Sequence, residues 1–280
     1  MNQKFPYTWE EAIQILRKDP AHQELIFNAY LTDDLVSNCK RFASSEEFQE
    51  TLKLIRKYAG NVKKVLDVPG GNGIATYAFA SSGFDVTVVE PDASASVGRG
   101  AIQFVLDQAS LKATIVEAFG ENLPFQDGTF DVVYVRQGLH HAYDLNKMVS
   151  EYFRVLKKGG ILLGCREHVV DNHGSSKEAF LKAQVDHQLY GGENAFTLKE
   201  YKAAFEQAGF ELCEIISPYS SPINLFPKTP ESLQEKILAT SVGKTLSAIL
   251  PRKWVVKIGM EAIKFAKLPG RMYSFVGKKA

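Results

Sequence analysis

Two segments in the first half of the chain have the residue types and spacing to bind a nucleoside. The sequence VLDVPGGNG at 65–73 is an apolar run that leads into a glycine-rich turn, and a helical pattern follows. Such a turn lets backbone N–H groups approach a ligand closely and directs a helix N-terminus at its anionic end. Glu90 ends the next apolar run, VTVVEPD, where a carboxylate can accept hydrogen bonds from both ribose hydroxyls. Together the two segments predict a nucleoside ligand.

The glycine turn differs from two other nucleotide-binding motifs. A nicotinamide fingerprint requires glycine or alanine at the third position, but Gly71 and Gly73 are followed by Thr76. The lysine of a phosphate-binding P-loop is missing from this turn. The sequence therefore favours neither a dehydrogenase nor a nucleoside triphosphatase.

Short apolar runs alternate with helical patterns through the middle of the chain. The runs predicted as strands are 63–68, 85–90, 113–118, 131–136 and 160–167. The intervening segments predicted as helices are 73–81, 97–108 and 144–156. This alternation predicts parallel strands joined by crossover helices, an α/β sheet covered on both faces. Ligands of such sheets bind at the carboxyl ends of the strands.

Helical patterns flank this core on both sides. Residues 8–58 read as helices, opened by capping-box spacings at Thr8 with Glu11 and at Ser44 with Glu47. We therefore divide the chain into an N-terminal helical extension at 1–60, a core at 61–216, a helical insertion at 217–269 and a final strand at 270–280. The insertion is expected to act as a lid.

The segment from Lys228 to the C-terminus is strongly basic. It holds 11 Lys and Arg against 3 Asp and Glu. A solvated helix face is the simplest interpretation, but contact with an anionic substrate or with a membrane surface also fits this pattern. Trp254 and Phe265 lie at helical positions of the insertion, where core packing is expected and lid contacts are the alternative.

Four ordered segments resemble one family. The sequences VLDVPGGNG, VTVVEPD, FGENLPFQDGTFDVVYVRQGLHH and LKKGGILL resemble the successive motifs of class I S-adenosylmethionine-dependent methyltransferases of the small-molecule, type 11-like kind. The resemblance covers residues 60–168. It implies a Rossmann-like sheet of seven strands with helices on both faces, and S-adenosyl-L-methionine as cofactor.

The resemblance also implies roles for individual residues. It places the methionyl part of the cofactor against the first motif and the adenine near the segment before LPF. Arg136 and Gln137 would lie beside the sulfonium. The implied cofactor-binding residues are Asp67, Pro69, Gly71 and Gly73 for the methionyl part, Glu90 for the ribose, and Phe119, Gly120 and Glu121 for the adenine.

Two positions depart from the family pattern. Pro69 stands where the family has the first glycine of its turn, and proline fixes φ and removes an N–H donor. Phe119 stands where many relatives have an acid that binds the adenine amino group, so stacking is expected there instead. Glu121 is either the replacement carboxylate or a solvated loop acid.

The acceptor side is less clearly marked in the sequence. Methyl transfer to a hydroxyl or an acidic carbon needs a general base, whereas an amine acceptor needs none. The candidates at the strand ends are His140, His141 and Glu167, with His168, His187, Tyr190 and Glu193 as candidates for contact with the substrate. A metal site built from His140, His141, His168 and His173 lacks a recognisable ligand spacing, so no metal is predicted.

The overall composition is that of an ordinary globular chain. Its 280 residues include 45% apolar and 23% charged residues with a net charge of +1, which gives no reason to expect a nucleic-acid partner. Three well-separated cysteines favour neither disulfides nor a zinc cluster. A cytoplasmic location without a membrane span, and a monomer or homodimer, are expected.

The sequence thus predicts an S-adenosylmethionine-dependent methyltransferase that acts on an oxygen or nitrogen atom of a small molecule, either a metabolite or a glycan precursor. An anionic acceptor such as a nucleotide-linked sugar would explain the basic insertion. Two alternatives remain. One is a catalytically silent protein of this fold with a regulatory or scaffolding role. The other is a peripheral membrane enzyme that methylates a carbon of a lipid or quinone.

Overall fold

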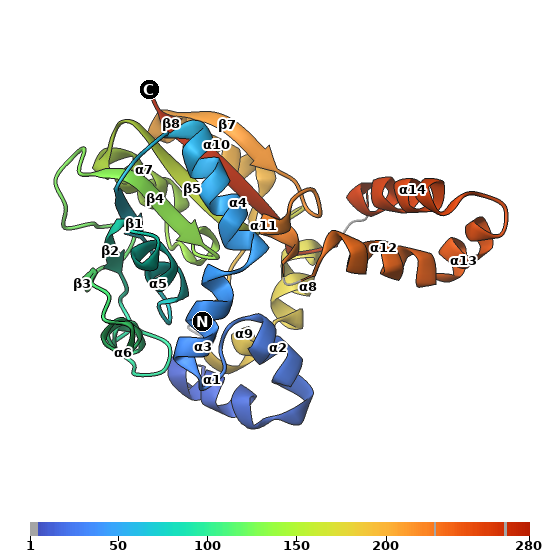
Figure 1. Ribbon diagram of the computed structural model, residues 1–280, viewed down its shortest axis with the longest axis horizontal. Coiled ribbons are helices and arrows are strands. Elements are labelled where there is room, and N and C mark those ends of the chain that lie inside the picture. Colours follow the sequence, from blue (N-terminus) through green and yellow to red (C-terminus); the bar gives the residue numbers. More distant parts are fainter. Residues whose placement is uncertain (1–4, 227, 266–267) are drawn as a thin grey trace.

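A single mixed sheet forms the centre of the molecule (Figure 1). The computed structural model describes residues 5–226, 228–265 and 268–280. Along the sheet the strands lie in the order β3-β2-β1-β4-β5-β8-β7, and a short β6 pairs with β5 outside this path. Their bounds are β1 Lys64–Asp67, β2 Asp85–Val89, β3 Thr114–Val116, β4 Phe130–Arg136, β5 Leu156–Val170, β6 Phe196–Thr197, β7 Phe210–Ile216 and β8 Arg271–Lys279.

The strand directions confirm the predicted α/β class. Strands β1 to β5 pair in parallel, whereas β8 runs antiparallel between β5 and β7. All five central strands predicted from the sequence are present. The path holds the seven strands expected, and the two-residue β6 is an addition that the sequence did not predict.

Helices cover both faces of the sheet. On one face α3, α4 and α5 pack against side chains such as Val65, and on the other α7 and α10 pack against side chains such as Leu66. Neighbouring residues of one strand are thus buried on opposite faces, as in parallel sheets generally. The helices of the N-terminal part and the core are α1 Trp9–Lys18, α2 Gln23–Asn28, α3 Leu35–Ala43, α4 Glu46–Tyr58, α5 Ile74–Ser81, α6 Arg99–Ala109, α7 Leu145–Val155, α8 Ser175–Ala183, α9 Val185–Tyr190 and α10 Leu198–Ala208.

Capping side chains fix several helix starts. Thr8 forms the predicted capping box with Glu11 at the start of α1. The second predicted cap was wrong by one residue: Ser45 caps α4, and Ser44 ends α3. Glu47 therefore takes no part in the cap, and its side chain is fully buried.

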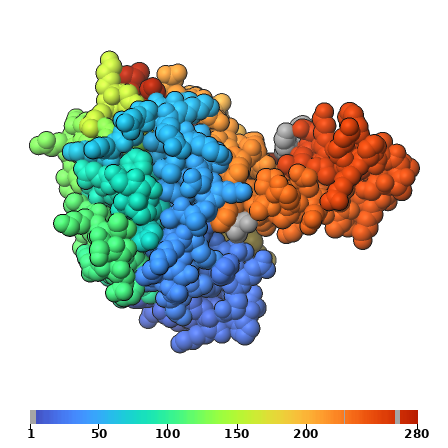
Figure 2. Space-filling model, viewed as in Figure 1, coloured from blue at the N-terminus to red at the C-terminus, as the bar shows by residue number. Residues whose placement is uncertain are grey.

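The helices between β7 and β8 form a projecting arm. They are α11 Pro222–Leu225, α12 Pro230–Ala239, α13 Ser241–Ser247 and α14 Arg252–Phe265. Figures 1 and 2 show α12 to α14 extending away from the body of the molecule. In this arrangement the arm does not act as the expected lid. Trp254 is 49% exposed, so its expected core packing is wrong, and the side chain of Phe265 lies outside the described residues.

The N-terminal helices lie near the carboxyl edge of the sheet instead. Ile13, Leu16 and Ile26 form a small apolar cluster with Val97, which lies two residues before α6. Trp9 at the start of α1 contacts Tyr190 at the end of α9, with ring centroids 4.6 Å apart. The N-terminal extension and α9 therefore cover this edge of the sheet. Within the described residues, no helix has both the length and the apolar character needed to cross a bilayer.

Candidate active site

A cavity of about 890 Å³ lies at the carboxyl edge of the sheet. Its walls come from the carboxyl ends of β1 to β5 and the segments that follow them, and α1, α2 and α9 contribute to its cover. Within the described residues, the walls contain none from α12, α13 or α14. The volume falls in the range of about 300–1,000 Å³ typical of small-molecule pockets. The fold thus places a pocket where ligands of open α/β sheets bind.

The glycine turn after β1 forms one end of this cavity. Gly71 has φ +53, and a Cβ atom built there would meet nothing within 4 Å, so its backbone is open to a close ligand. Gly73 has φ +88 and packs against Ile102 of α6; it does not line the cavity. Pro69 lines the cavity and packs against Gly138, where a Cβ would lie 2.4 Å from the proline ring. The proline therefore joins the turn to the loop after β4, and the open turn is retained.

Two buried carboxylates stand beside the turn. Glu90 accepts hydrogen bonds from the N–H groups of Gly71 at 2.7 Å and Asp92 at 2.9 Å. Asp67 accepts from the Thr76 hydroxyl at 2.6 Å. Burial raises the pKa of Glu90 and of Asp67 to about 7 each. Glu90 is held rigidly at the end of β2, with lone pairs left to accept ribose hydroxyls.

The segment predicted to hold adenine lies on the cavity wall. The Phe119 ring is 57% exposed there and offers a face for stacking. Gly120 has no room for a side chain because the Tyr152 hydroxyl would lie 2.5 Å from its Cβ. Glu121 is buried and accepts the N–H of Tyr143 at 2.9 Å, so it is not a solvated loop acid. We propose that Phe119, Gly120 and Glu121 form the adenine side of the pocket.

Arg136 is bound by a residue that sequence reasoning missed. Its guanidinium Nε lies 2.6 Å from Glu47 Oε1, and Nη1 donates to the Gln137 side chain at 2.9 Å. Burial opposes the charge of Arg136, but Glu47 outweighs it and raises the pKa further. Arg166 also lies near Glu47, at 3.7 Å. Glu47 therefore neutralises positive charge beside the expected sulfonium, and only its place at a helix start was visible in the sequence.

On the acceptor side, His140 is held by Glu167. The imidazole Nδ1 of His140 lies 2.8 Å from Glu167 Oε2, which also accepts the His140 N–H at 3.0 Å, and Glu167 Oε1 accepts the N–H of Gly138 at 3.0 Å. Burial would lower the pKa of His140, but Glu167 and Glu193 outweigh it and raise this pKa to about 9. Glu167 is fully buried and does not line the cavity, so it positions the loop after β4.

Two further histidines face the same region and are neutral near pH 7. His141 Nδ1 lies 2.7 Å from the Gly192 carbonyl, and His168 Nδ1 lies 3.2 Å from the Gly270 carbonyl. Burial lowers the pKa of His141, and lowers that of His168 to about 4. In both residues the carbonyl fixes Nδ1 as the protonated nitrogen, which leaves a lone pair on Nε2.

Acidic side chains from α9 and the loop after it complete this side. Glu193 Oε2 lies 3.3 Å from His140 Nε2, and Tyr190 donates to Glu193 Oε1 at 3.3 Å. Asp186 lines the cavity, and burial together with Glu193 raises its pKa to about 6. His187 lies outside the cavity lining with its ring against Phe5.

The strand order with one reversed strand, the open glycine turn and the strand-end acid define a methyltransferase of class I. The family model described as "Methyltransferase domain" matches residues 66–164. An uncharacterized methyltransferase of Synechocystis is 36% identical over 154 residues, which cover 53% of this chain and 66% of that protein. The ubiquinone/menaquinone biosynthesis C-methyltransferase UbiE of Rhizobium johnstonii is 39% identical over 102 residues, or 36% of this chain and 40% of that protein.

Solved structures agree on the fold. A geranyl diphosphate C-methyltransferase of Streptomyces coelicolor superposes over 100% of this chain and 91% of its own, with a TM-score of 0.57 and 13% identity. A phosphoethanolamine N-methyltransferase of Haemonchus contortus superposes over 98% of this chain and 61% of its own, with a TM-score of 0.58 and 19% identity.

Residues 66–164 therefore form a methyltransferase domain of the class I kind, for which S-adenosylmethionine is the cofactor. The alignments span 66% and 40% of the length of these two curated relatives. The residues present fit that cofactor, because Gly71 leaves open space at the turn and Glu90 is fixed beside it by the Gly71 N–H, where a ribose would lie.

Proposed function

We propose that this chain transfers a methyl group to an oxygen or nitrogen atom of a polar small molecule, either a metabolite or a glycan precursor. The observation that carries the proposal is the acceptor side of the cavity, whose wall is ionisable. The residues concerned are His140, His141, His168, Asp186 and Glu193. Such a wall binds an acceptor with hydrogen-bonding groups, because buried polar side chains left without partners are costly.

His141 is the proposed general base for a hydroxyl acceptor. Its Nδ1 is fixed by Gly192, its side chain is 33% exposed, and its lowered pKa leaves Nε2 unprotonated at neutral pH. His140 is unsuited to this role because its raised pKa keeps it protonated. Glu167 acts as a positioning residue through His140.

The remaining groups prepare the site for transfer. Bound S-adenosylmethionine supplies an electrophilic methyl group on a sulfonium. Glu47 offsets the charge of Arg136 and so reduces its repulsion of that cation. Trp9 and Tyr190 cover the cavity from the N-terminal side and limit the access of water. Because the basic arm extends away from the cavity, its lysines do not support the expected anionic acceptor.

The test uses S-adenosylmethionine with a ¹³C-labelled methyl group and a panel of acceptors. The panel contains phenols, sugar hydroxyls, amines and activated carbon acids, and NMR identifies the labelled atom. We expect O–CH₃ or N–CH₃ products. For a hydroxyl acceptor, His141→Gln should lower kcat by about 10²–10⁴-fold with little change in KM. The control variant His173→Gln changes an exposed histidine that pairs with Glu200, and its kcat should equal that of the wild type.

Two results would contradict the proposal. A label found only on carbon would favour the type of transfer named for the UbiE relative. Binding of S-adenosylhomocysteine without transfer to any acceptor would favour the catalytically silent alternative.

A second candidate is a peripheral membrane enzyme with a lipid or quinone acceptor. The specific observation is the arm, where Val242, Ile249, Trp254 and Ile258 are exposed by 44–75%. Trp254 and Ile258 lie one turn apart on α14, and Lys257 lies beside the Trp254 ring with 5.4 Å between its Nζ and the centroid. Exposed apolar side chains between basic ones are typical of helices that bind anionic membrane surfaces.

Vesicle co-sedimentation of the full chain tests this candidate. Vesicles with anionic lipid should retain the wild type, and Trp254→Glu should release it. The matched control is Phe104→Glu, which changes an exposed apolar residue of α6 and should stay bound to the vesicles. Equal sedimentation of the wild type and Trp254→Glu would exclude this candidate.

A further inference from the structure

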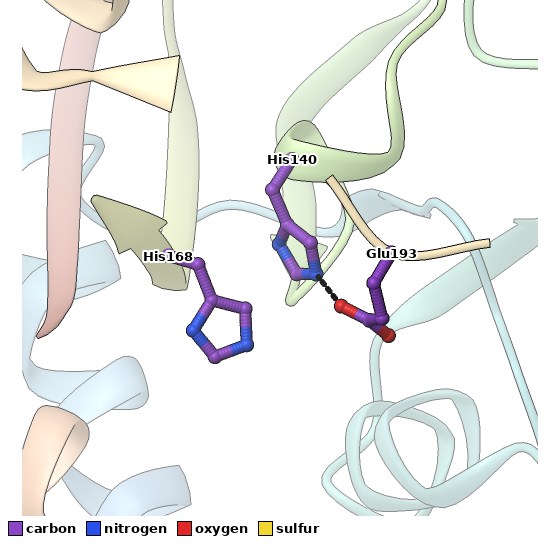
Figure 3. Close-up of side chains that lie close together, drawn as sticks. All are labelled: His140, His168 and Glu193. Carbon is purple, nitrogen blue, oxygen red and sulfur yellow. Dashed lines mark ion pairs between the residues drawn. The ribbon is translucent and has the colours of Figure 1, made fainter. Parts of the chain in front are cut away.

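Three potential metal ligands converge beside the acceptor side of the cavity. His140 Nε2 or Nδ1, a ring nitrogen of His168 and a Glu193 oxygen all lie within 4.8 Å of one another, the one such group found among the described residues. Figure 3 shows that they come from three elements: the short turn after β4, the end of β5, and the loop after α9. Because 140, 168 and 193 are far apart in sequence, no ligand spacing could reveal them.

Each histidine has its other nitrogen fixed by an acceptor. The Glu167 carboxylate holds His140 Nδ1 at 2.8 Å, and the Gly270 carbonyl holds His168 Nδ1 at 3.2 Å. A carboxylate or carbonyl behind Nδ1 is the arrangement found behind metal-bound histidines, because it sets the tautomer and directs Nε2 at the ion. Two histidines with this arrangement face one carboxylate here.

One oxygen of the Glu193 carboxylate lacks a hydrogen-bond partner. Glu193 Oε2 is buried and makes no hydrogen bond within the described structure; its contact is the 3.3 Å approach to His140 Nε2. Two donors on one ion, each about 2.0–2.2 Å from it, are separated by about this distance. Glu167 and Glu193 also bring two negative charges close together, which a dication would balance.

We propose that His140, His168 and Glu193 bind one divalent transition-metal ion, which displaces to solvent the Nε2 proton that His140 carries in the metal-free chain. Two imidazoles and one carboxylate form a borderline ligand set that suits zinc, manganese or iron(II) better than calcium. Three protein ligands leave coordination positions open toward the cavity. The ion takes an oxygen of the acceptor and lowers the pKa of its hydroxyl; this last step rests on the proposed function.

His141 and His173 are not ligands. His141 Nε2 lies 3.9 Å from Glu193 and stays available as a base, and His173 pairs with Glu200 on the surface at 2.8 Å. The proposed site therefore shares only His140 and His168 with the four-histidine set considered from the sequence, for which no metal was predicted.

The test begins with the full chain stripped of metal by a chelator. Titration calorimetry with Zn²⁺, Mn²⁺ and Co²⁺ separately should give one ion per chain for the wild type. Glu167→Gln, which removes the support of His140, should weaken binding by about 10–100-fold. His168→Ala and Glu193→Gln should weaken it by more. His173→Ala should bind as the wild type does.

Spectroscopy provides a readout that does not depend on activity. The Co²⁺-loaded chain should show visible d–d absorption that His168→Ala alters and His173→Ala does not. Circular dichroism and binding of S-adenosylhomocysteine establish that each variant is folded. Wild-type metal binding no tighter than in His168→Ala, or an equal loss in His173→Ala, would overturn the proposal.

The two proposals fail in different ways. Metal bound at these three residues without methyl transfer to any acceptor would leave the site standing and refute the proposed function. Methyl transfer by a chain that binds no metal would do the reverse.

Discussion

Glu90→Gln should make the protein more stable while it weakens cofactor binding. Burial raises the pKa of Glu90 from 4.5 to about 7, because the folded protein disfavours the charged carboxylate. An acid whose pKa is raised on folding costs stability once it is ionised. The wild type should therefore lose stability as the pH rises from about 4.5 to about 7, and this loss should be absent in the glutamine variant.

The size of the effect follows from the shift. A pKa difference of about 2.5 corresponds to a penalty of about 3 kcal/mol above pH 7, and to about 1 kcal/mol at pH 5. Each oxygen of Glu90 accepts one backbone N–H group. The glutamine side chain has only one oxygen, so it loses one of these two hydrogen bonds, which lowers the stability of the variant by about 1 kcal/mol at every pH. The gain of the variant over the wild type should thus grow by about 2 kcal/mol between pH 5 and pH 8.

Denaturant unfolding at these two pH values measures this growth directly. Asp85→Asn changes an exposed acid at the start of the same strand and should show no comparable pH dependence. Calorimetry should show S-adenosylhomocysteine bound about 10–100-fold more weakly by Glu90→Gln, because charge-assisted bonds to the ribose are lost. A stability difference that stays constant or shrinks with pH would refute the electrostatic argument, and unchanged affinity would refute the assignment of the ribose site.

Two further predictions concern the packing around the cavity. Gly138→Ala should destabilise the fold by about 1–3 kcal/mol in denaturant unfolding, because its Cβ would lie 2.4 Å from the Pro69 ring and 2.8 Å from the Val135 side chain. Adding Pro69→Gly should restore only part of the loss, because the Val135 contact remains. Gly174→Ala, where the nearest atom lies 3.5 Å away, should be neutral. Glu47→Leu should cost about 3–5 kcal/mol by leaving Arg136 buried without its partner. Adding Arg136→Met should recover only part of this, because Arg166 also lies 3.7 Å from Glu47. A single-variant loss under about 1 kcal/mol would contradict the pairing.

The order of elements was predictable because local signals were strong. Apolar runs such as 131–136 end at turns and alternate with amphipathic helices, so β1 to β5 and the helices between them were found with small errors in their bounds. The cap of α4 was misplaced because Ser44 and Ser45 both satisfy the local rule, and packing decided between them. The glycine turn and Glu90 could be proposed as cofactor-binding residues from the sequence because their chemistry lies within short segments.

The cover of the cavity was assigned to the wrong segment. A basic helical insertion near the end of the chain has the composition of a lid, but composition does not give direction. The arm leaves the sheet between β7 and β8, at the edge away from β1 and β2. Trp9 and Tyr190 close the cavity instead, and their contact joins residues 181 positions apart, beyond the reach of any local pattern.

The acceptor side shows why residue type alone did not assign roles. The sequence offered His140 and His141 as catalytic candidates and His168 as a substrate contact, but only their neighbours in the fold distinguish their charge states. Glu167 and Glu193 keep His140 charged, whereas burial keeps His141 and His168 neutral. One residue type thus takes different charge states within a single cavity, because a carboxylate lies behind His140 whereas a backbone carbonyl lies behind His141 and behind His168.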